Sequence, residues 1–598
     1  MSSQFALFKT RRFAPLFGTQ FLGAFNDNLY KNALVVLLTF QTTQWTSMKP
    51  EILANLAAGM FILPFFLFSA TAGQLADKYD KAWLARFSKV LEIVIMLLAA
   101  AGFWLTSLPM LLLALFLLGA QSTLFGPVKY AILPQHLHED ELVGGNALVE
   151  AGTFVAILVG TLAGGLLAGS VEHPAWIAAG GMVVAVAGYL ASLGIPVAPA
   201  PDPGLRVNPN PLTETWRCIG YARQNRTVFL SILGISWFWL YGALFLAQFP
   251  AYGRQVLGGT ESSVTLLLAV FTVGIGLGSL LCERLSGKHV EMGLVPFGSI
   301  GLTIFAADLA LASPLALPPG APLGLSALLA MPAIWRVLTD LLLLGVFGGF
   351  FIVPLYALMQ VYSAEETRAR TIAANNILNA LFMVMGALAA AGILALGASI
   401  PNLFLVAAIT NALVALYIYG LLPEFLQRFV VWMMMHTATK LETEGVEQNV
   451  PEQGPAILLF DQATPASILA MMAACRRPIR FVVAAELLKP ALLRFVLRQS
   501  RCIVWPTDDA EAARNKAKQE ILAALKSGGL VGLSLAQWAD LALCPEDVPT
   551  APVLLELDEG EAGGWRAGLF GALTGARFPA AMAVRARAGS GEGEVGRY

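Results

Sequence analysis

The chain has 598 residues, of which 57% are hydrophobic and only 13% are charged, with a formal net charge of −1. Its mean hydropathy of +0.68 is far above that of a soluble globular protein. Because apolar stretches long enough to cross a bilayer recur along it, the composition predicts a polytopic membrane protein and no nucleic-acid partner.

The apolar segments lie at regular intervals up to about residue 421. Each is close to the roughly 20 residues that a helix needs to span a bilayer. The first is too long for a cleavable signal peptide and is expected to be a retained span. The segments are 15–42, 51–72, 83–107, 109–128, 142–170, 174–197, 228–252, 262–283, 290–313, 326–358, 371–396 and 401–421.

Basic residues gather on one side of these spans, which fixes the expected orientation. They precede the first span and follow the second, fourth, eighth and tenth, whereas the opposite side shows only Lys49 and Arg254. By the positive-inside rule both termini are predicted to be cytoplasmic.

The spans divide into two halves of six, predicted as 1–197 and 228–422, separated by a Pro-rich cytoplasmic linker at 198–227. A shift of 226 residues aligns the halves without a gap and pairs Gly119 with Gly345, Tyr130-Ala131 with Tyr356-Ala357, Glu139 with Glu365, Ala147 with Ala373 and Gly160 with Gly386. Parallel repeats of six spans are typical of one transporter architecture, in which the substrate site lies between the halves.

The second span ends in "GQLADKYDK", and the eighth ends in a looser copy, "GSLLCERLSGK". The first resembles the loop signature of the major facilitator superfamily. Physically, Asp77 could face a helix N-terminus of the other half and latch one conformation, and the alternative is a solvated turn. The expected latch residues are Gly73, Asp77, Lys81, Gly278, Glu283 and Arg284.

Polar residues inside the spans are the candidate substrate-binding groups, because an ionisable residue is costly there and marks a pathway or site. Asp27 and Lys31 are four residues apart, share a helix face and could pair; glue between helices is the alternative. Arg336 and Asp340, also four apart, are expected to form a local pair. The candidates are Asn26, Asp27, Asn28, Lys31, Glu150, Asn375 and Asn376.

Three stretches, "TQFLGAFNDNLYKNAL", "GGFFIVPLYALMQ" and "RARTIAANNILNALFMVMG", resemble the bacterial lysophospholipid transporter family of the major facilitator superfamily over roughly residues 1–425. The resemblance implies a secondary transporter that moves lysophosphatidylethanolamine-like lipid from the outer to the inner leaflet of the inner membrane for re-acylation. No cofactor is expected, and the sequence has no nucleotide-binding loop of the GxxxxGK type. An exporter of a small amphiphile or drug is the alternative, and a non-transporting scaffold is a further one.

The last part of the chain is more polar: residues 1–430 carry 41 charged residues and residues 431–598 carry 36, although the second stretch is less than half as long. Residues 423–447 are expected to form a helix that lies on the membrane surface or leads into a domain. No metal site is expected, because the five cysteines, Cys218, Cys282, Cys475, Cys502 and Cys544, lack metal-ligand spacing.

Residues 448–585 resemble a glycerolipid acyltransferase, a small α/β domain whose chemistry needs a His and an Asp with four residues between them. Gln462 and Ser467 stand at those positions, so the domain is expected to be inactive. A transporter fused to an active acyltransferase is the alternative. A cytoplasmic acyltransferase or acyl-carrier-protein ligase is a candidate partner. Residues 586–598 are expected to be disordered.

Overall fold

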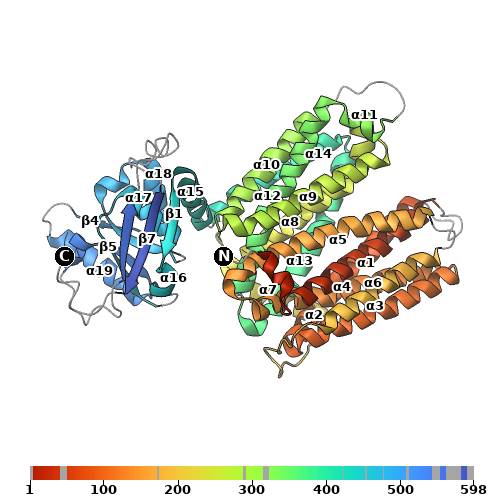
Figure 1. Cartoon of the computed structure of the whole chain (residues 1–598), viewed down its shortest axis with the longest axis horizontal. Helices are drawn as coiled ribbons and strands as arrows, with labels where there is room; N and C mark the ends of the chain where they lie inside the picture. The colour runs from red at the N-terminus through yellow and green to blue at the C-terminus, as the bar shows by residue number, and fades with distance from the viewer. Residues whose placement is uncertain are drawn as a thin grey trace. The chain divides into compact units, whose positions relative to one another are not determined.

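The computed structural model forms two compact units, Met1–Leu416 and Tyr417–Tyr598, here named the membrane unit and the C-terminal unit (Figure 1). The residues that the structure describes are 4–40, 50–170, 174–286, 291–313, 322–421, 423–451, 454–475, 477–506, 511–541, 553–559 and 581–588.

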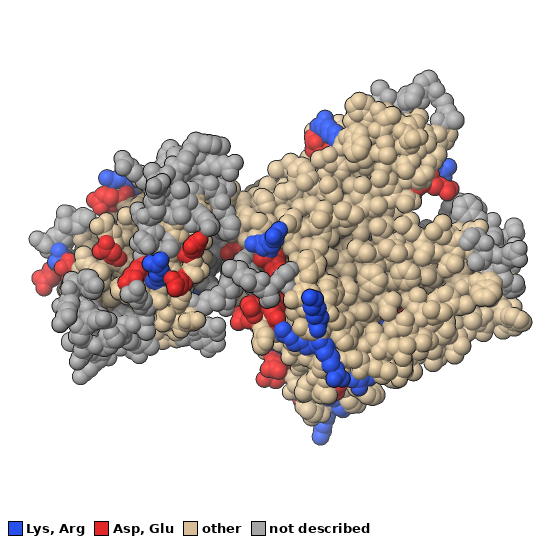
Figure 2. Space-filling view, in the orientation of Figure 1, with Lys and Arg blue, Asp and Glu red and all other residues tan. Residues whose placement is uncertain are grey.

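The membrane unit is a bundle of long helices. The first half holds α1 (Ala14–Phe40), α2 (Pro50–Lys78), α3 (Lys81–Trp104), α4 (Leu108–His136), α5 (Leu142–Ser170) and α6 (Ala175–Leu193). The second half holds α8 (Arg226–Ala251), α9 (Glu261–Leu285), α10 (Leu294–Ala312), α12 (Pro332–Tyr362), α13 (Arg368–Ala395) and α14 (Ile400–Leu421). Charged side chains gather at the ends of these helices and leave the surface between them uncharged on the face shown in Figure 2.

Among the described residues, 11 helices are long and apolar enough to cross a membrane by length and composition. The helix outside this set is α1, whose sequence holds Asn26, Asp27, Asn28 and Lys31. It has 27 residues, or roughly 40 Å, which exceeds the bilayer core. Since α1 packs along α5 and α6, we count it as the twelfth span.

The predicted repeat reappears in the element bounds. The short helix η3 (Glu139–Glu141) precedes α5, and its counterpart η5 (Glu365–Thr367) precedes α13. The first residues of α5 and α13, Leu142 and Arg368, are separated by the same shift that aligns the two halves in sequence. The packing repeats as well, since α1 packs on α5 as α8 packs on α13, and α2 packs on α4 as α9 packs on α12.

Glycines let helices of one half approach each other closely. A Cβ added to Gly278 of α9 would lie 2.0 Å from the Val346 carbonyl oxygen of α12. In the first half, a Cβ on Gly119 of α4 would lie 2.3 Å from the Phe61 carbonyl oxygen of α2. Such contacts are typical of helix packing in membranes, where small residues let backbones meet.

We expect Gly278→Ala to lower the thermal stability of the purified protein clearly, because α9 and α12 must separate to admit the methyl group; overpacking of this kind costs about 1–3 kcal/mol. Gly276→Ala on the same helix is the matched control, since a Cβ there meets nothing within 4 Å. Equal melting temperatures for the two variants would contradict this account of the α9–α12 contact.

The linker between the halves is partly helical, which the sequence analysis did not predict. Helix α7 (Pro211–Gln224) begins at Asn210, whose side chain accepts hydrogen bonds from the backbone N–H groups of Leu212 and Thr213. Helix α8 begins at Arg226, two residues before the predicted span, with Asn225 capping it in the same way. Both starts follow the preference for asparagine at the residue before a helix.

The C-terminal unit is an α/β domain with a seven-stranded sheet in the order β1-β7-β6-β2-β5-β3-β4. The strands are β1 (Lys440–Glu444), β2 (Ala456–Phe460), β3 (Ile479–Ala484), β4 (Ile503–Trp505), β5 (Leu530–Ser534), β6 (Val553–Glu559) and β7 (Ala581–Ala588). All neighbours are parallel except β6 and β7. The central strands β2 and β5 are buried throughout, as expected of a parallel sheet covered on both faces.

Helices cover this sheet: α15 (Pro423–Ala438), α16 (Val446–Asn449), α17 (Pro465–Ala474), α18 (Ala491–Gln499), α19 (Glu511–Lys526) and α20 (Leu535–Leu541). Val431, Met434 and Met435 of α15 belong to the domain's hydrophobic core. Segment 423–447 therefore leads into the domain and is part of it, and its membrane-surface alternative is wrong for these side chains.

Two predicted boundaries also change. Strand β1 falls inside segment 423–447 and pairs with β7, so the domain starts before residue 448. Strand β7 continues to Ala588, and Ala586 is buried, so residues 586–588 are ordered rather than part of a disordered tail. The rest of the predicted tail, 589–598, lies outside the described residues.

Candidate transport site and latch

The first group of predicted site residues lies on α1. Asp27 is buried, and its Oδ2 accepts a hydrogen bond from the Ser122 hydroxyl of α4. Its Oδ1 has no hydrogen-bond partner among the described residues. Lys31 donates through Nζ to Asn28 Oδ1 at 2.9 Å and stands over the Phe61 ring of α2 at 5.3 Å from the ring centre.

Asp27 and Lys31 therefore bind other partners, and the expectation that they pair with each other is not met. Opposite charges remain one helical turn apart on one face of α1. Each side chain keeps bonding capacity: Asp27 through Oδ1, and Lys31 through the donors that Asn28 does not use.

Asn26 belongs to a different network inside the first half. Its Nδ2 donates to Glu92 Oε1 of α3 at 2.7 Å, and Glu92 Oε2 pairs with Lys89 Nζ at 2.6 Å. Both charged side chains are completely buried, and Gln121 of α4 donates to Ser88 beside them at 2.7 Å. Glu92 of α3 thus holds α1 against α3 through Asn26.

Glu150 of α5 lies in a third cluster, which crosses between the halves. It accepts a hydrogen bond from the Tyr130 hydroxyl, while its other oxygen has no partner among the described residues. The Tyr130 ring stacks on that of Tyr356 at 4.4 Å, and the Tyr356 hydroxyl accepts from Trp239 Nε1 at 3.1 Å. Tyr130 and Tyr356 are repeat equivalents, so pseudo-symmetry brings them face to face.

Asn375 and Asn376 of α13 approach this cluster from the second half. Asn375 is fully buried and lies next to Tyr356. The Asn376 amide lies so close to α4 that a Cβ on Gly126 would be 2.6 Å from its Nδ2. The predicted site residues are thus divided between α1 and this inter-half cluster.

Asp77, the predicted latch acid, lies at the N-terminus of α13 in the other half. Its carboxylate accepts from the backbone N–H groups of Ala369 and Arg370 at 3.1 and 3.3 Å. It also pairs with Arg370 Nε at 2.8 Å, and both side chains are buried. Gly73, one turn earlier, allows the approach, since a Cβ there would lie 2.7 Å from the Ala373 Cβ. We call this end of the membrane unit, where α2 ends and α13 begins, the latch end.

The second copy of the motif has a similar position at the N-terminus of α5. Glu283 is buried, and a Cβ on Gly144 would lie 3.1 Å from its Oε1. Arg284 is exposed, and the buried Lys81 points to the Pro199 carbonyl oxygen at 3.4 Å. Gln360 of α12 closes the same end by donating to Asn146 Oδ1 and to the Tyr130 carbonyl oxygen, both at 3.1 Å. The Glu283 and Gln360 contacts join the two halves at the latch end, whereas Lys81 joins α3 to the linker.

At the opposite end, Arg336 of α12 makes a two-pronged contact with Asp308 of α10, with Nε 3.0 Å from Oδ2. The predicted local pair with Asp340 is therefore replaced by an interhelical pair between α12 and α10.

In the C-terminal unit, Gln462 and Ser467 follow β2. Gln462 is exposed, whereas Ser467 is buried in the first turn of α17. Ser467 exchanges hydrogen bonds with Thr464 in a capping box and donates to the Gln462 carbonyl oxygen at 2.8 Å. Its hydroxyl thus stabilises a helix start.

The sequence also matches a known family and named relatives. Residues 16–342, more than half of the chain, match the Major Facilitator Superfamily. The lysophospholipid transporter LplT of Klebsiella pneumoniae subsp. pneumoniae is 32% identical over 367 residues, which cover 60% of this chain and 82% of that protein. The chain belongs to the lysophospholipid transporter family of the major facilitator superfamily.

Another member, LplT of Serratia proteamaculans, is 29% identical over 365 residues and 82% of its length. Among solved structures, the human organic anion transporter MFSD10 aligns with a TM-score of 0.54 and 14% identity, covering 68% of this chain and 99% of that one. FucP in the outward conformation gives 0.52 and 14%, covering 68% and 97%. These structures support the superfamily fold of this family member, a multi-pass membrane protein.

We expect Asp77→Asn to loosen the latch end. The substitution leaves the buried Arg370 guanidinium with only the more distant Asp202 carboxylate, 3.8 Å away, and breaking a buried pair costs about 3–5 kcal/mol. Spin labels at Tyr79→Cys and Glu366→Cys, both exposed residues, would report a longer and broader distance distribution by pulsed electron paramagnetic resonance.

Asp140→Asn removes an exposed acid near the same end and is the matched control. An unchanged distribution in folded Asp77→Asn protein would show that the Asp77–Arg370 pair does not hold the halves together.

Proposed function

We propose that this chain is a secondary transporter of lysophosphatidylethanolamine-like lipid in the bacterial inner membrane. It would carry the lipid from the outer to the inner leaflet by alternating access, with both termini in the cytoplasm. The names of its relatives support the lysophospholipid as cargo, and the basic residues around the spans support the orientation.

The observation that carries the proposal is that Asp27 and Lys31 share one face of α1 without pairing. Among the described residues, the hydrogen-bond partners of these two side chains, Ser122 and Asn28, are neutral. A zwitterionic head group would offer each an oppositely charged partner: its ammonium group for Asp27 and its phosphate for Lys31. Asp27 Oδ1 would accept from the ammonium, and Lys31 Nζ would bind the phosphate, with Asn28 orienting Lys31. The Phe61 ring beside Lys31 offers apolar surface.

The other two clusters have supporting roles in this proposal. Asn26, through Glu92, holds α1 in place. Glu150, Asn375 and Asn376 lie one to two turns from the latch end, where they would contact the head group as the halves rock. The latch contacts of Asp77 and Gln360 are formed here, so this conformation would be the one open to the outer leaflet.

Transport should be measured with purified protein in liposomes, by following labelled lysophosphatidylethanolamine across the bilayer with diacyl lipid as the control substrate. We expect selective movement of the single-chain lipid. Asp27→Asn and Lys31→Gln should each lower the rate roughly tenfold or more, since one charge-assisted hydrogen bond contributes about 1.5–3 kcal/mol.

Glu261→Gln, an exposed substitution at the start of α9, is the matched control and should transport normally. Wild-type rates in both site variants would reject the assigned roles. Movement of small amphiphilic drugs in place of the lipid would favour the exporter alternative.

We further propose that the C-terminal unit is an acyltransferase-like domain without catalytic activity, which docks lipid or a cytoplasmic acyltransferase. Gln cannot take up a proton near neutral pH, and Ser467 is engaged in the helix cap.

Full-length protein is expected to transfer no acyl group to lysolipid in liposomes where an active bacterial acyltransferase, added as a positive control, does so. Acyl transfer by the wild type that disappears in Gln462→Ala would contradict inactivity and support the fused-enzyme alternative.

A further inference from the structure

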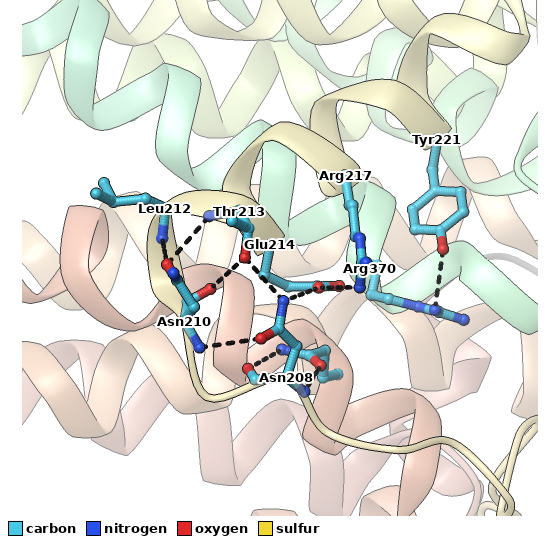
Figure 3. A network of polar contacts seen from close by, with 9 residues as sticks. Asn208, Asn210, Leu212, Thr213, Glu214, Arg217, Tyr221 and Arg370 are labelled. Carbon is cyan, nitrogen blue, oxygen red and sulfur yellow. Dashed lines mark hydrogen bonds and ion pairs between the residues drawn. The ribbon is translucent and has the colours of Figure 1, made fainter.

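The linker helix α7 has two distinct faces. Glu214, Cys218 and Ala222 are buried against the membrane unit. On the opposite face, Leu212 and Trp216 are 74% and 69% exposed, although both are large and apolar. Arg223 is also exposed, and so is Arg217, which lies at the edge of this face with Nη1 3.5 Å from the Glu214 carboxylate (Figure 3), so the free surface of α7 is apolar and basic. The only acid in the helix, Glu214, is among the buried residues.

The buried face ties α7 to the latch from the side of Arg370. The Arg370 guanidinium stacks over the Tyr221 ring at 4.9 Å and reaches its hydroxyl at 3.4 Å (Figure 3). The segment before α7 adds Asp202, whose carboxylate lies 3.8 Å from the Arg370 guanidinium. One side of the linker therefore holds the second half of the membrane unit.

The same segment also holds the first half. Asn208 donates its backbone N–H to Gln74 Oε1 of α2 at 2.7 Å, and its side chain reaches Glu214 at 3.3 Å. The Asp202 backbone N–H donates to the Asp77 carbonyl oxygen at 3.0 Å. Because the linker is hydrogen-bonded to α2 and also contacts Arg370 of α13, opening of the latch end requires the linker to lose its contacts with one of these helices.

The position of α7 indicates what covers its free face. It packs on the ends of α2, α13 and α8, which are membrane spans, so it lies at the level where the spans leave the bilayer. Trp83, at the start of α3 on the same end, is 51% exposed. Exposed tryptophan with arginine at this depth is typical of a helix in the head-group region, and the arginines complement anionic lipid.

We propose that the exposed face of α7 binds an anionic lipid surface and that this contact holds the latch end closed. Leu212 and Trp216 insert among the head groups, while Arg223 binds their phosphates and Arg217 does so with the donors that its contact to Glu214 leaves unused. The lipid then restrains the helix that bridges both halves and opposes opening. The inference rests on the proposed latch but not on the identity of the transported substrate.

Cys218 provides a direct readout, because it lies on the buried face of α7. It is completely buried, and burial raises the pKa of its thiol to about 12. Maleimides react with the thiolate, so labelling is suppressed while α7 is docked and becomes fast when α7 detaches.

The experiment uses full-length protein with Cys218 as its only cysteine, the other four being replaced by serine. The protein is reconstituted in phosphatidylcholine liposomes with or without about a third of phosphatidylglycerol. A membrane-permeant maleimide labels both insertion orientations. We expect labelling of Cys218 to be roughly tenfold slower with phosphatidylglycerol, as two arginines at an anionic surface would give.

The double variant Arg217→Gln and Arg223→Gln should lose this lipid dependence and label at the same rate in both liposomes. Arg206→Gln, an exposed linker arginine outside α7, is the matched control and should keep the dependence. Trp216→Ser should label faster in both lipids, while Asp77→Asn should label fastest of all.

A labelling rate that ignores phosphatidylglycerol, or a double variant that keeps the full dependence, would overturn the inference and leave the face to a protein partner. Because labelling needs no transport, lipid-dependent labelling in a protein that moves no lysolipid would reject the proposed substrate and leave this inference intact.

Discussion

The contact between the Asp77 carboxylate and the N-terminus of α13 joins the two halves of the membrane unit. Two backbone N–H groups and the Arg370 guanidinium converge on one buried carboxylate. A buried ion pair is favourable only while every partner is present. If one partner is removed, the other charge stays buried without compensation for its lost hydration. Such a contact suits an element with two discrete positions, because a partly separated pair would lose its attraction without regaining hydration.

The neighbouring contacts depend on this one geometrically. The stacked pair Tyr130–Tyr356, the Asn146–Gln360 bonds and the Glu283 carboxylate at α5 all join the halves near the same end. Each joins a residue of the first half to a residue of the second half, so these contacts add to the one that Asp77 makes at the same end. The linker adds a further connection, since it binds both halves through Gln74 and Arg370.

The charged groups deeper in the bundle differ in how fully their charges are paired. Lys89 and Glu92 neutralise each other and are enclosed by amides and hydroxyls, as the low dielectric demands. Asp27 and Lys31 instead hydrogen-bond to Ser122 and Asn28, and Asp27 Oδ1 keeps no partner among the described residues, which is why we propose them as the head-group site. The polar residues of the first half thus divide into a satisfied structural network and an incompletely satisfied pair.

Sequence alone predicted the spans, the six-plus-six repeat and the approach of Asp77 to a helix N-terminus of the other half, because hydropathy and a fixed shift of 226 residues are properties of the linear chain. It also located the charged residues of the spans, since a charge among apolar residues is visible without coordinates. The start of the C-terminal domain was predicted too late in the chain, because β1 is short and becomes a strand only by pairing with β7, which is far away in sequence.

Only the tertiary structure decided which charges pair. Helical spacing suggested Asp27 with Lys31 and Arg336 with Asp340, but Ser122, Asn28 and Asp308 compete successfully from the same or neighbouring helices. It also showed that residues Pro211–Gln224 form a helix with one buried face, from which Tyr221 contacts Arg370. The Pro-rich sequence before this helix predicts only a linker. The physical reason is the same in both cases. Side chains bind the partners nearest in space, and residue spacing along a helix predicts only the contacts made within that helix.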